Sequence, residues 1–194
     1  VTSDVHPESY TWVAENGDWD GDGNWTVISA YERSKPGAPE DEIRFDVVAG
    51  ATRTVTLDRD ASVGKINPAG GNYTSHFGVE IVSPNAATLT LDNGDDPARF
   101  VVTGAGTDRF YFGTSEQDSL VLKLAPVNVF ERGADISFSC YFYGKVTGGT
   151  PDSPVSLTLR NTGVYSTVNW CLLNPENDFC ADLTVETTVD QVGD

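Results

Sequence analysis

A short acidic segment near the start of the chain has the residue types and spacing of a cation site. Asp18, Asp20 and Asp22 alternate with other residues and are followed by Gly23, which is the first half of a calcium loop. The twelfth position of that loop is Ser29 instead of the bidentate Glu of an EF-hand. The segment favours a solvated acidic turn, with a calcium site on these carboxylates as the alternative. We therefore expect no cofactor, and calcium is the one alternative to that expectation.

The same region holds three of the four tryptophans of the chain. Trp12, Trp19 and Trp25 carry large apolar surfaces that are costly to leave in water. They predict a cap over the end of a hydrophobic core, because the first coil of a stacked β-structure must be sealed against solvent. The alternative is an exposed platform on which these rings, or tyrosines, stack against sugars.

The three cysteines limit the thiol chemistry of the chain. Cys171 and Cys180 flank a short Asn, Pro, Glu and Asp loop that suits a local disulfide, and a bridge from Cys140 to Cys171 is the competing pairing. A disulfide would require a secreted, oxidising context. The chain contains no Cys-x-x-Cys pair, which excludes a zinc ribbon and a thioredoxin-type motif.

Motifs for catalysis are scarce. The two histidines, His6 and His76, belong to no His-Glu-x-x-His motif, and there is no Gly-x-Ser-x-Gly elbow. Pairs of carboxylates are always available among 29 Asp and Glu, so we interpret the clusters at 40–42 and 92–96 as solvated turns. We expect no enzyme activity. A polysaccharide lyase or hydrolase ranks behind structural and sugar-binding roles.

Length and charge restrict the class of protein further. The 194 residues, 39% hydrophobic and 21% charged, suit a folded domain. A net charge of −17 argues against nucleic acid and anionic lipid as partners. No apolar run is long enough for a transmembrane helix. The absence of Met, the start at Val1 and an alternating pattern that runs up to Val192 lead us to expect a processed or partial chain.

Short strands must position these residues. No window shows the apolar period of an amphipathic helix, whereas alternating runs rich in β-branched and aromatic residues recur between Gly, Asn, Asp and Pro clusters. The predicted strands are 42–47, 53–58, 79–82, 87–92, 99–102, 109–112, 119–124, 136–143, 155–159, 168–173 and 183–186. Asn93 with Gly94, and Gly148 with Gly149, predict turns.

Two architectures fit many short strands with Gly-rich turns, namely a β-sandwich or jelly roll and a β-solenoid. Similar strands recur at irregular spacings, centred on Leu57, Leu91, Leu122, Leu159 and Val185. This weak period leaves the two architectures equal. In a solenoid, Leu57, Leu91 and Val101 would point into the core.

A resemblance to a known family separates the two architectures. Trp12, the Gly-Asp-Trp-Asp of 17–20, the Asn-Trp of 24–25, a Pro-containing turn at 36–41 and the strand at 43–45 resemble autotransporter-associated β-strand repeat proteins. These are secreted bacterial surface proteins. Residues 177–185 are similar to the family's Asn-x-Tyr/Phe-x-Gly-x-Thr-x-Val repeat, with Ala181 where Gly is usual. The resemblance implies a right-handed parallel β-helix that is exported as a passenger or surface scaffold.

We therefore predict an all-β, right-handed parallel β-helix, with residues 1–41 as a Trp-rich cap and 42–194 as its coils. The expected function is that of a non-catalytic extracellular structural protein, a scaffold or adhesin on the bacterial cell surface. Its expected partners are copies of itself, joined end to end or laterally into fibres or layers, or cell-surface glycans. A carbohydrate-binding β-domain is the alternative.

Overall fold

The computed structural model describes residues 7–28, 33–46, 52–69, 77–104, 107–115, 119–133, 137–163 and 167–187. Within these ranges the chain forms strands and turns and contains no helix. The all-β prediction is therefore confirmed. His6, His76, Ser29 and the chain after 187 lie outside the described residues.

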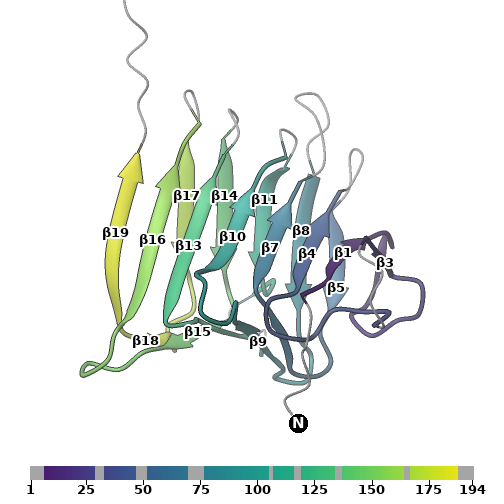
Figure 1. Ribbon diagram of the computed structural model, residues 1–194, viewed down its shortest axis with the longest axis horizontal. Coiled ribbons are helices and arrows are strands. Elements are labelled where there is room, and N and C mark those ends of the chain that lie inside the picture. Colours follow the sequence, from purple (N-terminus) through teal and green to yellow (C-terminus); the bar gives the residue numbers. More distant parts are fainter. Residues whose placement is uncertain are drawn as a thin grey trace, which may run out of the picture.

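The strands form three sheets that run along the length of the molecule (Figure 1). Sheet A contains β1 (Ser9–Trp12), β3 (Trp25–Val27), β4 (Glu42–Phe45), β7 (Lys65–Pro68), β10 (Ala98–Val102), β13 (Val127–Arg132), β16 (Val155–Asn161) and β19 (Ala181–Thr187). Sheet B contains β2 (Asn16–Asp18), β5 (Arg53–Thr56), β8 (Phe77–Val82), β11 (Thr107–Phe112), β14 (Phe138–Phe142) and β17 (Val168–Leu172). Sheet C contains β6 (Ala61–Val63), β9 (Thr88–Leu91), β12 (Val121–Lys123), β15 (Lys145–Gly148) and β18 (Asp178–Phe179).

The order of these strands identifies a β-solenoid. From β4 onward the chain visits sheets A, B and C in turn, and each strand pairs in parallel with the strand three places later. Five complete coils result, from β4–β6 to β16–β18. The solenoid prediction is confirmed, and the β-sandwich or jelly-roll alternative is wrong, since those folds are built from antiparallel strands.

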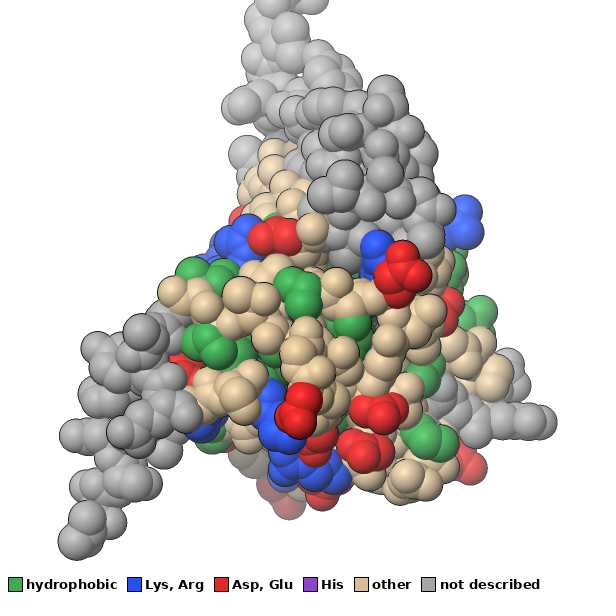
Figure 2. All heavy atoms as spheres, turned by 90° about the vertical axis from the view of Figure 1, so that its right-hand side faces the viewer, with side chains coloured by type: hydrophobic (Ala, Val, Ile, Leu, Met, Phe, Trp, Pro, Cys, Tyr) green, Lys and Arg blue, Asp and Glu red, His purple; other side chains and the backbone are tan. Residues whose placement is uncertain are grey.

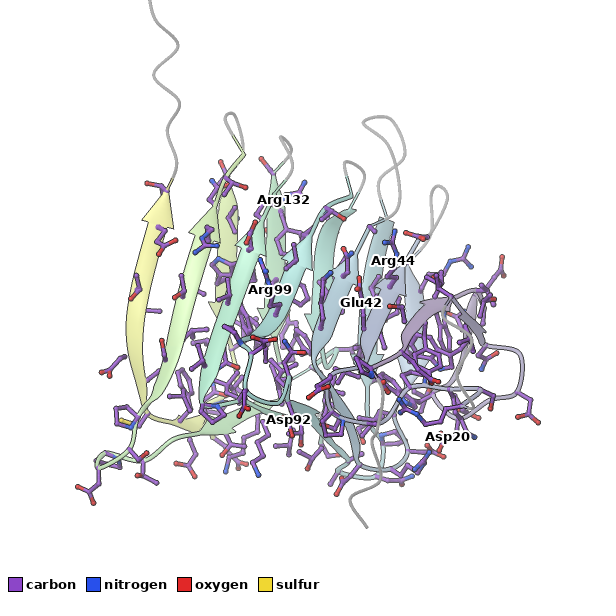
Figure 3. All side chains as sticks on the ribbon, viewed as in Figure 1. Asp20, Glu42, Arg44, Asp92, Arg99 and Arg132 are labelled. Atoms are coloured by element: carbon purple, nitrogen blue, oxygen red, sulfur yellow. The ribbon has the colours of Figure 1, made fainter. Side chains whose placement is uncertain are left out.

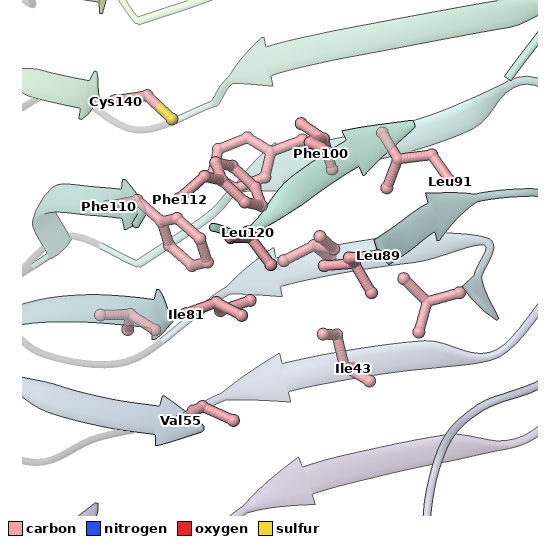
Figure 4. Packing of buried hydrophobic residues seen from close by; sticks show 14 of the residues in the cluster. Ile43, Val55, Ile81, Leu89, Leu91, Phe100, Phe110, Phe112, Leu120 and Cys140 are labelled. Carbon is pink, nitrogen blue, oxygen red and sulfur yellow. The ribbon is translucent and has the colours of Figure 1, made fainter. Parts of the chain in front are cut away.

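The core is a column of side chains inside the coils (Figure 4). Parallel register stacks equivalent inward residues of sheet A upon one another, in the row Tyr10, Ile43, Ile66, Phe100, Phe130, Leu159 and Val185. Phe100 lies at the centre, with its ring centroid 4.9 Å from that of Phe110 and 5.9 Å from that of Phe130. Interior stacking of this kind binds each coil to the next.

The predicted core residues fall on both faces of the coils. Leu57 and Leu91 are buried in the core cluster, as expected. Val101 is not part of that cluster. It lies between the inward Phe100 and Val102, so strand alternation turns its side chain to the outer face of sheet A. Val101 is nevertheless buried, at 8% exposure, so its predicted burial is confirmed, whereas its predicted place in the interior column is not.

The N-terminal end of the solenoid is closed. Strand β3 runs antiparallel to β1, with Trp12 opposite Trp25 and Tyr10 opposite Val27. This reversal ends the parallel stacking of sheet A. Figure 2 views this end of the molecule, where hydrophobic side chains appear as small separate patches among polar ones.

Candidate functional site

The acidic loop that suggested calcium is held by ion pairs. Asp20 (Figure 3) accepts a 2.6 Å hydrogen bond from Arg59 and lies 3.5 Å from Nζ of Lys35. The bonds from Arg59 lower the pKa of Asp20 from its ordinary value. Asp18 and Asp22 are exposed, and the described residues hold no group of three or more His, Cys, Asp or Glu arranged for a metal ion. Asp20 fastens the loop to the turn after β5, and calcium binding stays a prediction.

The three N-terminal tryptophans are all buried. The ring of Trp25 meets those of Trp12 and Trp19 edge to face, at centroid distances of 4.9 and 5.2 Å. The indole N–H of Trp25 donates to the carbonyl oxygen of Trp19 at 2.7 Å, and that of Trp19 donates to Pro36 at 3.0 Å. These rings seal the N-terminal end of the core, and no ring face is open to a sugar.

Two tyrosines form a stacked pair on the outer face of sheet B. Tyr111 and Tyr141 stand in register on β11 and β14, with ring centroids 5.2 Å apart and planes 14° apart. Tyr143 continues the stack at 6.3 Å. Because the faces of Tyr111 and Tyr141 are turned towards each other, the pair reinforces the contact between coils and does not present a flat platform.

All three cysteines are free thiols, so the predicted bridge between Cys171 and Cys180 is not formed in this structure. Cys140 points into the core, where burial raises the pKa of its thiol. Cys171 stands opposite Tyr141 on the outward-facing row of sheet B, so the competing pair of Cys140 and Cys171 lies on opposite faces. Cys180 lies between β18 and β19 and donates its backbone N–H to Gly148 at 2.9 Å.

A buried polar cluster beside the cap was missed from the sequence. Asp41 is 0% exposed and accepts two hydrogen bonds from the Arg33 guanidinium, at 2.6 and 2.7 Å, besides those from three backbone N–H groups. Tyr10 donates to the buried Glu8 carboxylate. Burial and this hydrogen bond raise the pKa of Tyr10 well above its usual range. The interpretation of 40–42 as a solvated turn is therefore wrong for Asp41.

Among the described residues, the C-terminal end of the solenoid is open, whereas three tryptophans seal the N-terminal end. A cavity of about 490 Å³ enters the core between the last strands. It is lined by Leu124, Phe130, Phe142, Val146, Leu157, Leu159, Trp170, Leu172, Phe179, Cys180, Ala181 and Leu183. All of these side chains are apolar apart from the cysteine thiol, so the cavity is an uncovered continuation of the core.

At this end each of the three sheets ends in a strand with one unpaired edge, as it does at the N-terminal end with β3, β2 and β6. In the described part of the chain, β19, β17 and β18 are the last strands of sheets A, B and C. On β19 (the yellow strand of Figure 1), the inward residues Leu183 and Val185 are 60% and 66% exposed. Apolar surface and free backbone N–H and C=O groups therefore occur side by side, which is the composition of a strand-docking site.

A row of alternating charges that begins at Arg99 (labelled in Figure 3) crosses the outer face of sheet A towards the open end. Arg99 lies 3.0 Å from Glu131, which lies 3.3 Å from Arg160, which in turn donates to Glu186 on β19 at 2.6 Å. This row cannot be recognised in the sequence, because its members are far apart along the chain and meet only through the parallel register of the coils.

Comparison of the chain with protein-family models, with curated proteins and with solved structures gave no match. In the described chain, no helix has the length and apolar character needed to cross a membrane. The candidate site is accordingly assigned from its geometry.

Proposed function

We propose that the protein is a non-catalytic structural scaffold that joins further β-structure through its open C-terminal end. The observation that carries this proposal is the difference between the two ends. Trp12, Trp19 and Trp25 seal the core at one end, whereas the other leaves a cavity of about 490 Å³ and exposes the inward residues Leu183 and Val185 of the edge strand β19. A coil of further β-structure would bury both the apolar surface and the free backbone groups.

The sequence supports an extracellular setting for this scaffold. Its N-terminal motif and the 177–185 repeat resemble exported bacterial surface proteins whose coils stack into a β-helix. A net charge of −17 would make neighbouring copies repel one another and would disfavour broad lateral contacts. A surface scaffold extended along its axis fits these features better than lateral layers.

The sugar-binding alternative receives less support. It depends on exposed aromatic faces, and Trp12, Trp19 and Trp25 are buried. We therefore do not propose a second function.

The test is whether the protein associates through its open end. Salt screens the repulsion between acidic copies, so sedimentation velocity should show monomers at low ionic strength and association at high ionic strength. The variant Val185→Lys places a charge at the mouth of the cavity and should stay monomeric. Ile28→Lys is the matched control, because Ile28 is similarly exposed, at 59%, near the closed end.

Two results would refute the proposal. One is a wild-type chain that neither associates at any salt concentration nor binds an added β-strand peptide at β19. The other is a Val185→Lys variant that associates as the wild type does, since the contact would then lie elsewhere on the molecule.

A further inference from the structure

We infer, on the basis of the function proposed above, that the open end takes up a β-strand of a separate polypeptide with basic residues on its outward face. The strand would pair in parallel with β19 and carry Lys or Arg at two outward positions four residues apart. Its two apolar residues between them would enter the cavity beside Leu183 and Val185. The argument rests on the charges and alternation of β19.

The charge row on sheet A defines the first basic position. Glu131 lies between Arg99 and Arg160, and its side chain is 17% exposed. Glu186 has Arg160 on one side, and its side chain is 45% exposed. The row alternates cation, anion, cation, anion up to the open edge. A cation on the next strand would give Glu186 the second partner that Glu131 already has.

The alternation of β19 defines the rest of the pattern. Asp182, Thr184 and Glu186 share the outer face. Leu183 lines the cavity, and Val185 stands in register with the inward Leu159, which also lines it. Cross-strand neighbours of opposite charge stabilise a sheet, and like charges opposite one another destabilise it. The complementary strand therefore reads basic, apolar, neutral, apolar, basic.

The same charges disfavour a second copy as the natural occupant. Two copies joined by their open ends would bring Asp182 and Glu186 of one against the same residues of the other. A copy stacked head to tail would offer β3 as its sheet A edge, and β3 contains no Lys or Arg. The sequence that follows β19, residues 188–194, contains two Asp and no Lys or Arg, so it also lacks the pattern. A separate basic strand satisfies both the charges and the cavity.

The probe is a synthetic peptide with the central sequence Lys-Val-Thr-Val-Lys between Gly-Ser flanks. Two control peptides have the same length: one carries Glu in place of both Lys, and the other, Val-Lys-Thr-Lys-Val, shifts the charges into the cavity. Binding is followed at low salt by the fluorescence of Trp170, which lines the cavity, and by hydrogen exchange of the β19 amides. The basic peptide should bind and protect β19, and both controls should bind at least about fivefold more weakly, as expected for the loss of surface ion pairs.

A charge exchange tests the position and the orientation of the strand. The Glu186→Lys variant should bind the basic peptide about fivefold more weakly than the wild type does. It should instead bind the peptide Lys-Val-Thr-Val-Glu more tightly, because the Glu of that peptide lies beside position 186 only when the strands are parallel. Glu176→Lys is the matched control, because this exposed acid lies in the turn between β17 and β18 and makes the same change in net charge.

The outcomes separate this inference from the proposed function. Equal binding of all three peptides, or no preference of Glu186→Lys for the exchanged peptide, overturns the basic strand while salt-dependent association at the open end still supports the scaffold. Absence of both peptide binding and association overturns both. Strong association of the wild type at low salt would identify a second copy as the occupant and overturn the inference alone.

Discussion

Val185 stands opposite Leu159 in the parallel register of β19 and β16, at the end of the interior row that begins with Tyr10. Every earlier member of that row has a further strand beyond it in the sheet, whereas Val185 is 66% exposed. Equivalent inward positions are therefore occupied by core residues in the earlier coils and by a surface residue in the last strand. This contrast is the physical basis of the proposed docking site.

We predict that Val185→Ala lowers the free energy of unfolding by less than about 0.5 kcal/mol, because an exposed side chain loses little burial. The matched substitution Val55→Ala, at a fully buried position of β5, should cost about 2 kcal/mol through lost burial and the cavity left behind. Urea unfolding of the two variants measures both values. Equal costs would mean that Val185 is covered in solution, contrary to an open end.

Asp41→Asn should destabilise the protein by about 2–3 kcal/mol, because it removes the charge that Arg33 and three backbone N–H groups share. This loss of unfolding free energy is smaller than that expected for a fully buried ion pair, because the Arg33 side chain is 32% exposed. Glu40→Gln, at the exposed neighbouring position, is the control and should change stability little. The urea concentration at the midpoint of unfolding, measured for both variants, tests this prediction. Similar midpoints would show that the Asp41 cluster does not stabilise the protein.

Alkaline pH should destabilise the protein through Tyr10. In the unfolded chain this phenol ionises near pH 10, whereas burial and the bond to Glu8 keep it protonated to higher pH in the folded chain. Its contribution is complete below about pH 10 and is lost above it, by up to about 1.4 kcal/mol per pH unit. The free energy of unfolding measured from pH 9 to pH 11 should fall more steeply for the wild type than for Tyr10→Phe. Parallel curves would contradict the burial of a neutral Tyr10.

The predicted strands all correspond to strands of the structure, because alternating β-branched and aromatic residues are a local signal that the coils retain. The cap was also predictable, since three closely spaced tryptophans need a core. The candidate site was not, because neither the open end nor the charge row can be recognised until the register places distant residues together. Glu131 and Glu186 belong to strands two coils apart in the sheet order.

Strand β13 shows how the local signal fails. Val127–Arg132 is absent from the predicted strands. Its apolar pattern would turn Val127 and Val129 inward, yet Asn128, Phe130 and Arg132 are the buried residues and Val127 is exposed. Parallel register with Phe100 and Leu159 fixes Phe130 inward. The tertiary stack thus overrides the preference of the flanking residues.

Asn128 makes this override testable. Its side chain accepts from the N–H of Ala125 at 3.0 Å and donates to the carbonyls of Ala125 and Ser156, at 2.7 and 3.2 Å. If apolar patterning determined this strand, Asn128→Val would stabilise the protein. We predict instead a loss of about 2–3 kcal/mol, because the substitution leaves buried backbone groups of the corner without partners. Ser156→Val, a polar-to-apolar change on the adjacent strand that keeps the Ser156 carbonyl, should cost less. Urea unfolding measures the loss, and an unchanged dependence of the unfolding free energy on urea concentration would assign it to the native state. A more stable Asn128→Val variant would show that the turn at Ala125 does not depend on the Asn128 hydrogen bonds.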